Sequence, residues 1–117
     1  MYIYKCKPVR VVDGDTVILD IDLGFHTTVR KSARLLGYDA PETFGVKKIE
    51  EEYKKGTKAA EHLRSLLTKT EYTCRTQLDK NDKYGRVLVD IYSNEDSIES
   101  INEQMIEFVE RLNNEAI

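Results

Sequence analysis

The chain has 117 residues, of which 33% are charged and 40% hydrophobic, and its formal net charge is −3. This length predicts one domain, residues 1–117, with a modest core. No apolar run reaches the roughly 20 residues that a membrane-spanning helix needs, and the N-terminus has no secretory signal. We therefore expect a cytoplasmic protein with no membrane partner. Cys6 and Cys74 are too few for a disulfide framework and are expected to be reduced thiols.

The charge is divided unevenly along the chain. Residues 94–117 hold seven acidic residues and one basic residue, which gives −6. Residues 1–93 hold 17 basic and 14 acidic residues, which gives +3. The negative total argues against a nucleic-acid partner, but this asymmetry carries more information than the total. A mildly basic body with an acidic C-terminal segment is expected.

The first third of the chain predicts a three-stranded meander. Residues 2–12 are rich in β-branched and aromatic side chains, and Pro8 predicts an edge or a bulge. A turn is expected at Asp13-Gly14. Apolar residues then alternate over 17–23, and residues 25–36 predict a third strand.

The middle of the chain predicts a long loop, a helix and two strands. Residues 37–56 show no consistent period, and a loop of that length in a compact domain is functional or mobile. Apolar residues at helical spacing predict a helix over 57–68. Residues 71–78 and 86–93 predict two more strands.

A capping box, Ser100-Ile101-Asn102-Glu103, predicts the start of a last helix that runs to about Asn113. The resulting β-β-β-α-β-β-α order is mainly β with helices (α+β), and it is the chain order of the five-stranded OB-fold barrel. We expect the Leu63/Leu66/Leu67 face to plug that barrel. The apolar stripe of the last helix could cover the barrel or pair with another chain. We expect a monomer without an obligate protein partner.

Five charged residues at predicted strand ends suit phosphate chemistry. Asp15, Asp39 and Glu42 are three carboxylates at strand ends, and two aspartates plus one backbone carbonyl and waters would make an open site for a hard cation such as Ca²⁺. The guanidinium groups of Arg34 and Arg86 can fork onto two phosphate oxygens. Glu42 is the candidate for orienting or deprotonating water.

Taken singly, each of these stretches has an ordinary structural explanation. Asp13-Gly14 alone is a turn, the acids of 39–42 are surface acids of a loop, and Arg86 is a hairpin residue. His26 and His62 are isolated, and we assign neither as a ligand or a base.

Together the motifs resemble the staphylococcal nuclease (thermonuclease) family over roughly Val9 to Val109. The matching stretches, in order, are Val12-Asp13-Gly14-Asp15-Thr16-Val17, Arg34-Leu35-Leu36-Gly37-Tyr38-Asp39-Ala40-Pro41-Glu42, Asp82-Lys83-Tyr84-Gly85-Arg86 and Ser100-Ile101-Asn102-Glu103. The resemblance implies an OB-fold, Ca²⁺-dependent phosphodiesterase. Such an enzyme cuts DNA and RNA with little sequence preference and leaves 3′-phosphate and 5′-hydroxyl ends.

The resemblance also implies a role for each residue. The metal ligands would be Asp15, Asp39 and the main-chain carbonyl of Ala40. Glu42 would be the base, acting through a bound water, and Arg34 and Arg86 would grip the scissile phosphate. A neighbouring phosphate would contact Lys83 and Tyr84.

Two departures from the family pattern bear on substrate binding. Ala40 stands where the family usually has Thr, which removes a hydroxyl but not the carbonyl ligand. Residues 105–109 contain no Gly, and the chain is expected to have a shortened C-terminus without the family's final helix. The alternative function is therefore a catalytically weak or inactive OB module that binds single-stranded nucleic acid or a protein partner.

Overall fold

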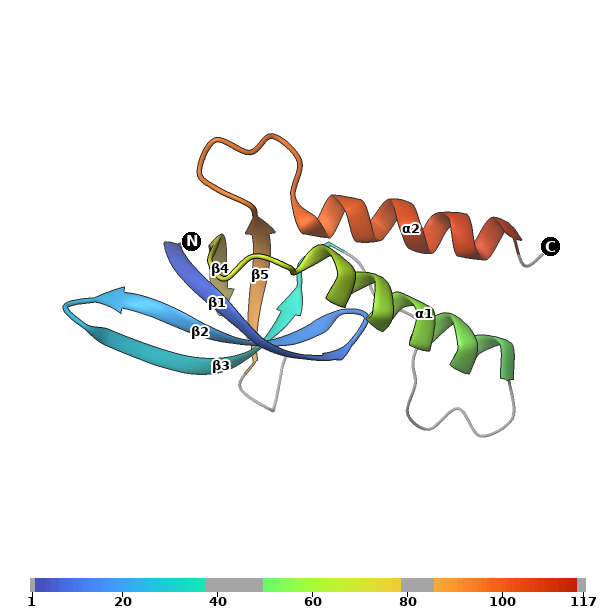
Figure 1. Ribbon diagram of the computed structural model, residues 1–117, viewed down its shortest axis with the longest axis horizontal. Helices are drawn as coiled ribbons and strands as arrows, with labels where there is room; N and C mark the ends of the chain where they lie inside the picture. The colour runs from blue at the N-terminus through green and yellow to red at the C-terminus, as the bar shows by residue number, and fades with distance from the viewer. Residues whose placement is uncertain (1, 38–49, 79–85, 116–117) are drawn as a thin grey trace.

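The computed structural model describes residues 2–37, 50–78 and 86–115, which form five strands and two helices (Figure 1). The strands close into a barrel in the order β1-β2-β3-β5-β4. The predicted α+β class and the β-β-β-α-β-β-α order are both confirmed. The elements are β1 (Tyr2–Asp13), β2 (Thr16–Gly24), β3 (Thr27–Leu35), α1 (Glu50–Leu66), β4 (Tyr72–Leu78), β5 (Val87–Tyr92) and α2 (Ile101–Glu115).

The long strand β1 joins the two sides of the barrel. Its start pairs antiparallel with β4, and its remainder pairs antiparallel with β2. The register shifts between Pro8 and Arg10, which is the irregularity predicted at the proline. On the other side, β3 pairs in parallel with β5, so that Ala33 lies opposite Val87 and Arg34 opposite Leu88. This parallel pair closes the barrel.

The β2–β3 connection is a tight turn, and the third strand begins two residues later than predicted. Gly24, Phe25 and His26 have φ values of 84°, 55° and 60°, so the chain turns through the left-handed region before Thr27. The favourable β propensity of Phe25 is overridden by this turn. Its side chain is fully exposed at the hairpin tip.

The barrel interior is filled by the alternate residues of each strand. On β2, for example, Val17, Leu19 and Ile21 are buried. Cys6 and Cys74 are both buried and free, as expected. A hydrogen bond to Cys74, together with burial, raises the pKa of the Cys6 thiol.

Helix α1 begins at Glu50, seven residues before the predicted start, so the loop predicted to reach Gly56 was too long. The run Glu50 to Lys55 has no apolar period, but it places glutamates four residues before lysines. Such i,i+4 spacing supports a helix, as do acidic residues in the first turn. The charge pattern therefore favours a helix where the hydrophobic pattern gives no indication of one.

The C-terminal half of α1 closes one end of the barrel. Leu63 is fully buried, and Leu66 and Leu67 pack against the same core, which confirms the predicted plug. The hydroxyl of buried Tyr72 donates to the Leu66 carbonyl oxygen at 3.0 Å and accepts from the Lys69 amide at 2.9 Å. The helix end is thereby attached to the first residue of β4.

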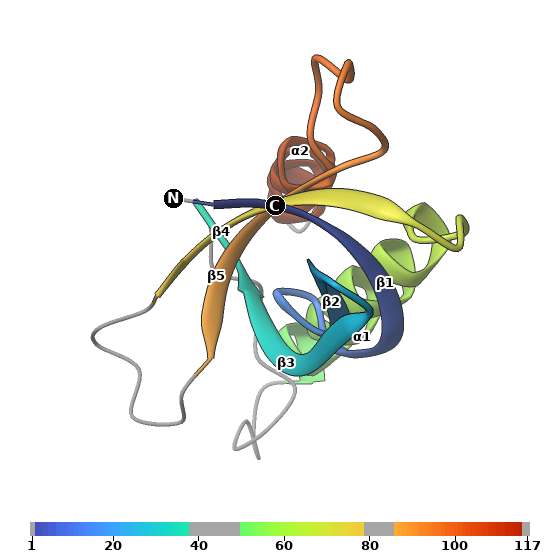
Figure 2. The same ribbon diagram turned by 90° about the vertical axis from the view of Figure 1, so that its left-hand side faces the viewer.

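Helix α2 lies outside the barrel, where it packs on α1 and β5 (Figures 1 and 2). The Ser100 hydroxyl accepts from the Glu103 amide at 3.1 Å, which confirms the predicted N-cap. The predicted apolar stripe is turned inward, since Ile101, Met105, Val109 and Leu112 are buried. Neither helix of the described residues is long and apolar enough to cross a membrane.

His62 contributes to the contact between the two helices. Its ring stacks on Phe108 with a centroid distance of 3.9 Å and an interplanar angle of 6°. Burial and the nearby Arg111 guanidinium lower the pKa of His62. The structure thus shows His62 in helix packing.

The amide side chain of Asn102 connects α2 to two strands. Its Oδ1 accepts from the Ile91 amide at 3.0 Å, and its Nδ2 donates to the carbonyl oxygens of Leu36 and Val89, both at 2.9 Å. The residue is 2% exposed. Buried polar groups of this kind are costly when a partner is removed.

Replacing Asn102 should destabilise the fold strongly. In Asn102→Ala the Ile91 amide and the Leu36 carbonyl lose their side-chain partner. We expect the free energy of unfolding to fall by about 2–4 kcal/mol, on the basis of about 1–3 kcal/mol for each buried group left unsatisfied. Urea denaturation measures this change. Asn114→Ala, on the exposed end of the same helix, is the matched control and should cost less than about 0.5 kcal/mol. Similar losses in the two variants would contradict this account.

Candidate active site

The turn between β1 and β2 places a carboxylate at one end of the barrel. Asp13 Oδ1 accepts from the Asp15 amide at 3.2 Å, which forms a local side-chain turn. Gly14 between them is buried, and both aspartates are half-buried. The Asp15 carbonyl oxygen accepts from the Leu35 amide at 2.7 Å, so the turn is also attached to the end of β3.

A threonine hydroxyl links the Asp15 carboxylate to an arginine. Thr16 Oγ1 donates to Asp15 Oδ1 at 3.0 Å and accepts from Arg86 Nη1 at 3.5 Å. Thr16 is 4% exposed, whereas Asp15 and Arg86 are half-buried. The Asp15 carboxylate and the Arg86 guanidinium therefore lie in the same partly accessible region, and the buried Thr16 hydroxyl hydrogen-bonds to both.

Arg34 reaches this region from the neighbouring strand. It lies directly opposite Thr16 in the β2–β3 register, so the two side chains share a face of the sheet. Arg86 comes one residue before Val87, which is the partner of Ala33. Asp15, Arg34 and Arg86 thus meet where β2 begins, β3 ends and β5 begins. The site itself stays a prediction, since Asp39 and Glu42 lie outside the described residues.

The other predicted site residues lie outside the described part of the chain. These are Asp39, Ala40, Glu42, Lys83 and Tyr84. Within the described residues, no three acidic, histidine or cysteine side chains gather around one point.

Sequence reasoning missed the part played by Thr16. The residue follows Asp15 directly and lies opposite Arg34 in the β2–β3 register, so its buried side chain is next to a carboxylate and a guanidinium. Its hydroxyl is a donor and an acceptor at once, which suits it to bridge a carboxylate and a guanidinium. The neighbouring Asp13 was predicted only as a turn residue, and the structure adds its bond to the Asp15 amide.

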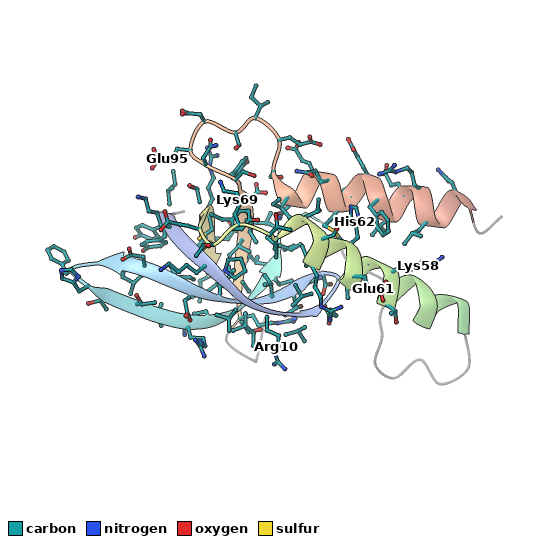
Figure 3. The ribbon with its side chains drawn as sticks, viewed as in Figure 1. Arg10, Lys58, Glu61, His62, Lys69 and Glu95 are labelled. Carbon is teal, nitrogen blue, oxygen red and sulfur yellow. The ribbon has the colours of Figure 1, made fainter. Side chains whose placement is uncertain are left out.

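A second polar region lies at the opposite end of β5. A groove of about 770 Å³ runs between residues 68–73 and 93–96, and Lys69 and Glu95 lie on it (Figure 3). Lys69 Nζ donates to the Ser93 carbonyl oxygen at 2.6 Å, which joins the two sides of the groove. Lys69 also lies over the Tyr72 ring at 5.6 Å. This lysine is therefore engaged in holding two loops together.

The donor chemistry of the site suits a hard cation. Asp15 offers a carboxylate oxygen at a half-buried position, and the predicted ligands Asp39 and Ala40 would add a carboxylate and a carbonyl oxygen. These are the oxygen donors that Ca²⁺ takes, with no soft sulfur or imidazole nitrogen among them. Of the three predicted ligands, Asp15 alone lies among the described residues, and its carboxylate oxygen is a donor type that Ca²⁺ takes.

Comparison with known proteins shows which family the chain resembles in sequence. The sequence model of the family described as "Staphylococcal nuclease homologue" matches residues 32–108. The chain is 30% identical over 86 residues to the thermonuclease of Staphylococcus hyicus and 35% identical over 83 residues to that of Staphylococcus intermedius. These alignments cover 74% and 71% of this chain but only 47% and 45% of the relatives. The chain thus spans about half the length of these two proteins.

The bond from Asp13 to the Asp15 amide should be measurable in stability. Asp13→Ala removes the acceptor, and we expect a loss of about 1 kcal/mol in the free energy of unfolding. Asp13→Asn keeps the Oδ1 acceptor and should retain most of that stability. Thermal or urea unfolding of the two variants checks this expectation. Equal losses in both would show that the charge of Asp13, and not its acceptor oxygen, stabilises the turn.

Proposed function

Since the chain belongs to the staphylococcal nuclease family, we propose that it is a phosphodiesterase that hydrolyses DNA or RNA with little sequence preference. The observation that carries the proposal is the convergence of Asp15, Arg34 and Arg86 at one end of the barrel. A carboxylate beside two guanidinium groups can hold a cation and a phosphate together.

The two arginines would bind the scissile phosphate. Guanidinium groups keep their charge when half-buried, and each presents parallel N–H donors to phosphate oxygens. Negative charge on those oxygens is stabilised by donors already in place, and losing one such donor costs on the order of 2.7–4 kcal/mol. Glu42 would orient or deprotonate the attacking water, with 3′-phosphate and 5′-hydroxyl ends as products.

Calcium would be held by Asp15, Asp39 and the Ala40 carbonyl. When bound, the ion supplies positive charge beside the phosphodiester and makes nearby water more acidic. The Thr16 hydroxyl orients the Asp15 carboxylate toward this role, since it occupies Oδ1. Arg86 is held by the same hydroxyl, so the two groups keep a fixed relation.

We propose that the chain acts as a monomer. The apolar stripe of α2 is buried within the chain against α1 and β5, so it is not available to a second copy. An inactive binding module is the second candidate, favoured by one observation. The Arg75 guanidinium lies 5.4 Å over the ring of half-buried Tyr92, an aromatic and basic pair of the kind that single-stranded nucleic acids contact.

Cleavage of single-stranded DNA with and without calcium tests the proposed reaction. We expect digestion in Ca²⁺, none in excess chelator, and a loss of at least about 10²-fold in turnover for Glu42→Gln, since general-base catalysis contributes 10²–10⁴-fold. Analysis of the product ends checks the direction of cleavage. Binding without turnover would favour the second candidate, and activity that survives chelation or Glu42→Gln would contradict the mechanism.

Removing the Thr16 hydroxyl should weaken the response to calcium. Thr16→Val keeps the shape of the side chain but releases the Asp15 carboxylate and Arg86. We expect the Ca²⁺ concentration for half-maximal cleavage to rise about tenfold, as is common when a group behind a metal ligand is lost. Thr76→Val is the matched control, because Thr76 is also buried in a strand and its hydroxyl donates to the Tyr2 carbonyl oxygen at 3.4 Å. An equal shift in both variants would point to a general loss of stability.

A further inference from the structure

We propose that Cys6 and Cys74 form a site of reversible oxidation, at which a peroxide joins the two thiols in a disulfide that links β1 to β4. These are the two cysteines of the chain, and both belong to the barrel core. The reaction is independent of phosphodiester cleavage and goes beyond the proposed function.

The strand register brings the two cysteines together. In the antiparallel β1–β4 pair, Cys6 lies opposite Tyr72 and Cys74 lies opposite Tyr4, so the cysteines are diagonal neighbours. Both side chains point into the barrel, where Cys6 is 1% and Cys74 is 0% exposed. The two thiols hydrogen-bond to each other, and both are free. Two sulfur atoms in this contact need only a small displacement to form a bond.

Disulfide formation requires a small movement of the backbone. Diagonal neighbours on antiparallel strands have Cα atoms about 7–8 Å apart, whereas the Cα atoms of a disulfide are usually about 4.4–6.8 Å apart. The first residues of β1, which lie beside β4 (Figure 1), must therefore approach that strand by roughly 1 Å.

The same residues of β1 can admit a small oxidant. The β1–β2 register begins at Lys5, so Tyr2, Ile3 and Tyr4 are paired with β4 on one side only. Tyr2 is 70% and Ile3 is 60% exposed, and backbone with few buried apolar contacts opens at a low cost in free energy. Local opening of this segment would expose the buried thiols without unfolding the barrel.

The hydrogen bonds of the two sulfur atoms assign them different roles. Cys74 Sγ accepts from the Cys6 thiol and from the Tyr4 amide, and both bonds lower the pKa of the Cys74 thiol. The bond to Cys74, together with burial, raises the pKa of the Cys6 thiol. Since the thiolate is the nucleophile, Cys74 reacts with the oxidant and Cys6 keeps its proton for the second step.

The reaction consumes one peroxide for each pair of thiols. The Cys74 thiolate attacks one peroxide oxygen, so that an S–O bond forms, the O–O bond breaks, and the leaving hydroxide takes up the thiol proton as water. The Cys6 sulfur then attacks the Cys74 sulfenic acid. An S–S bond forms, the S–O bond breaks, and the hydroxyl leaves as a second water with the Cys6 proton. Both sulfur atoms are oxidised and the peroxide is reduced to water.

Treatment of the folded wild-type chain with hydrogen peroxide tests the site. We expect both free thiols to disappear, the intact mass to fall by that of two hydrogen atoms, and the chain to remain a monomer. Dithiothreitol should restore both thiols. Thiol titration in guanidinium, mass spectrometry and non-reducing electrophoresis measure these changes. Survival of both thiols, addition of oxygen without a cross-link, or a disulfide between two chains overturns the proposal.

Serine variants test the order of the two steps. In Cys6→Ser the reaction should stop at the Cys74 sulfenic acid, which dimedone traps. In Cys74→Ser the remaining thiol should react at least about tenfold more slowly than the thiols of the wild-type chain, because the favoured thiolate is absent. Equal rates contradict the assignment of Cys74. If a variant is unfolded by circular dichroism, dimedone trapping in the wild-type chain replaces it: label on Cys74 supports the order, and label on Cys6 contradicts it.

Urea unfolding shows whether the disulfide fits the native β1–β4 pair. Because the bond restricts the unfolded chain, we expect the urea midpoint of the oxidised wild-type chain to rise by about 1 M over that of the reduced chain. Peroxide-treated Cys6→Ser is the matched control and should show no rise, which separates the disulfide from methionine oxidation. A lower midpoint of the oxidised wild-type chain, or an equal rise in both proteins, argues against a native link between the strands.

Discussion

The three hydrogen bonds of the Asn102 amide are the constraint on which the remaining structure depends. The parallel β3–β5 pair is short, and only Ala33, Arg34 and Leu35 take part in its register from β3. The Leu36 amide extends that pair by donating to the Val89 carbonyl oxygen at 2.8 Å, and Asn102 then binds both Val89 and Leu36. The buried Asn102 side chain thereby stabilises the closed barrel and attaches α2 to it. No apolar residue could satisfy these backbone groups.

The candidate active site depends on the same closure. Arg34 is delivered by β3 and Arg86 by the residue before β5, so their relation is set by the pairing that Asn102 supports. The β1–β2 turn is attached to the same strand, through the bond from the Leu35 amide to the Asp15 carbonyl oxygen. Two arginines and one carboxylate therefore converge from three separate chain segments. The barrel positions these groups before a ligand binds, so less conformational entropy is lost on binding.

Much of this could be predicted from the sequence, and the exceptions have physical causes. Alternation in β2 and the spacing of Leu63 and Leu66 are strong periodic signals, and the structure confirms both predictions. The start of α1 was missed because the first turns are charged and have no apolar period. Thr16 was missed because its function lies in a bridge from Asp15 to Arg86, which is 70 residues further along the chain than Thr16, and local pattern does not report such contacts.

The net charge of −3 is misleading about partners because it averages over surfaces that face different ways. The acidic residues of α2 and the exposed Arg10 are on different sides of the barrel (Figure 3), and electrostatic attraction between exposed groups decays over about 8–10 Å at physiological salt. A phosphate that approaches Arg34 and Arg86 also meets the Asp15 carboxylate, so the charge near the candidate active site is set by a few groups of both signs. The Arg30–Asp20 pair adds almost no net charge at this range, although it orders the sheet surface. The total charge of the chain therefore does not decide which ligands one particular surface can bind.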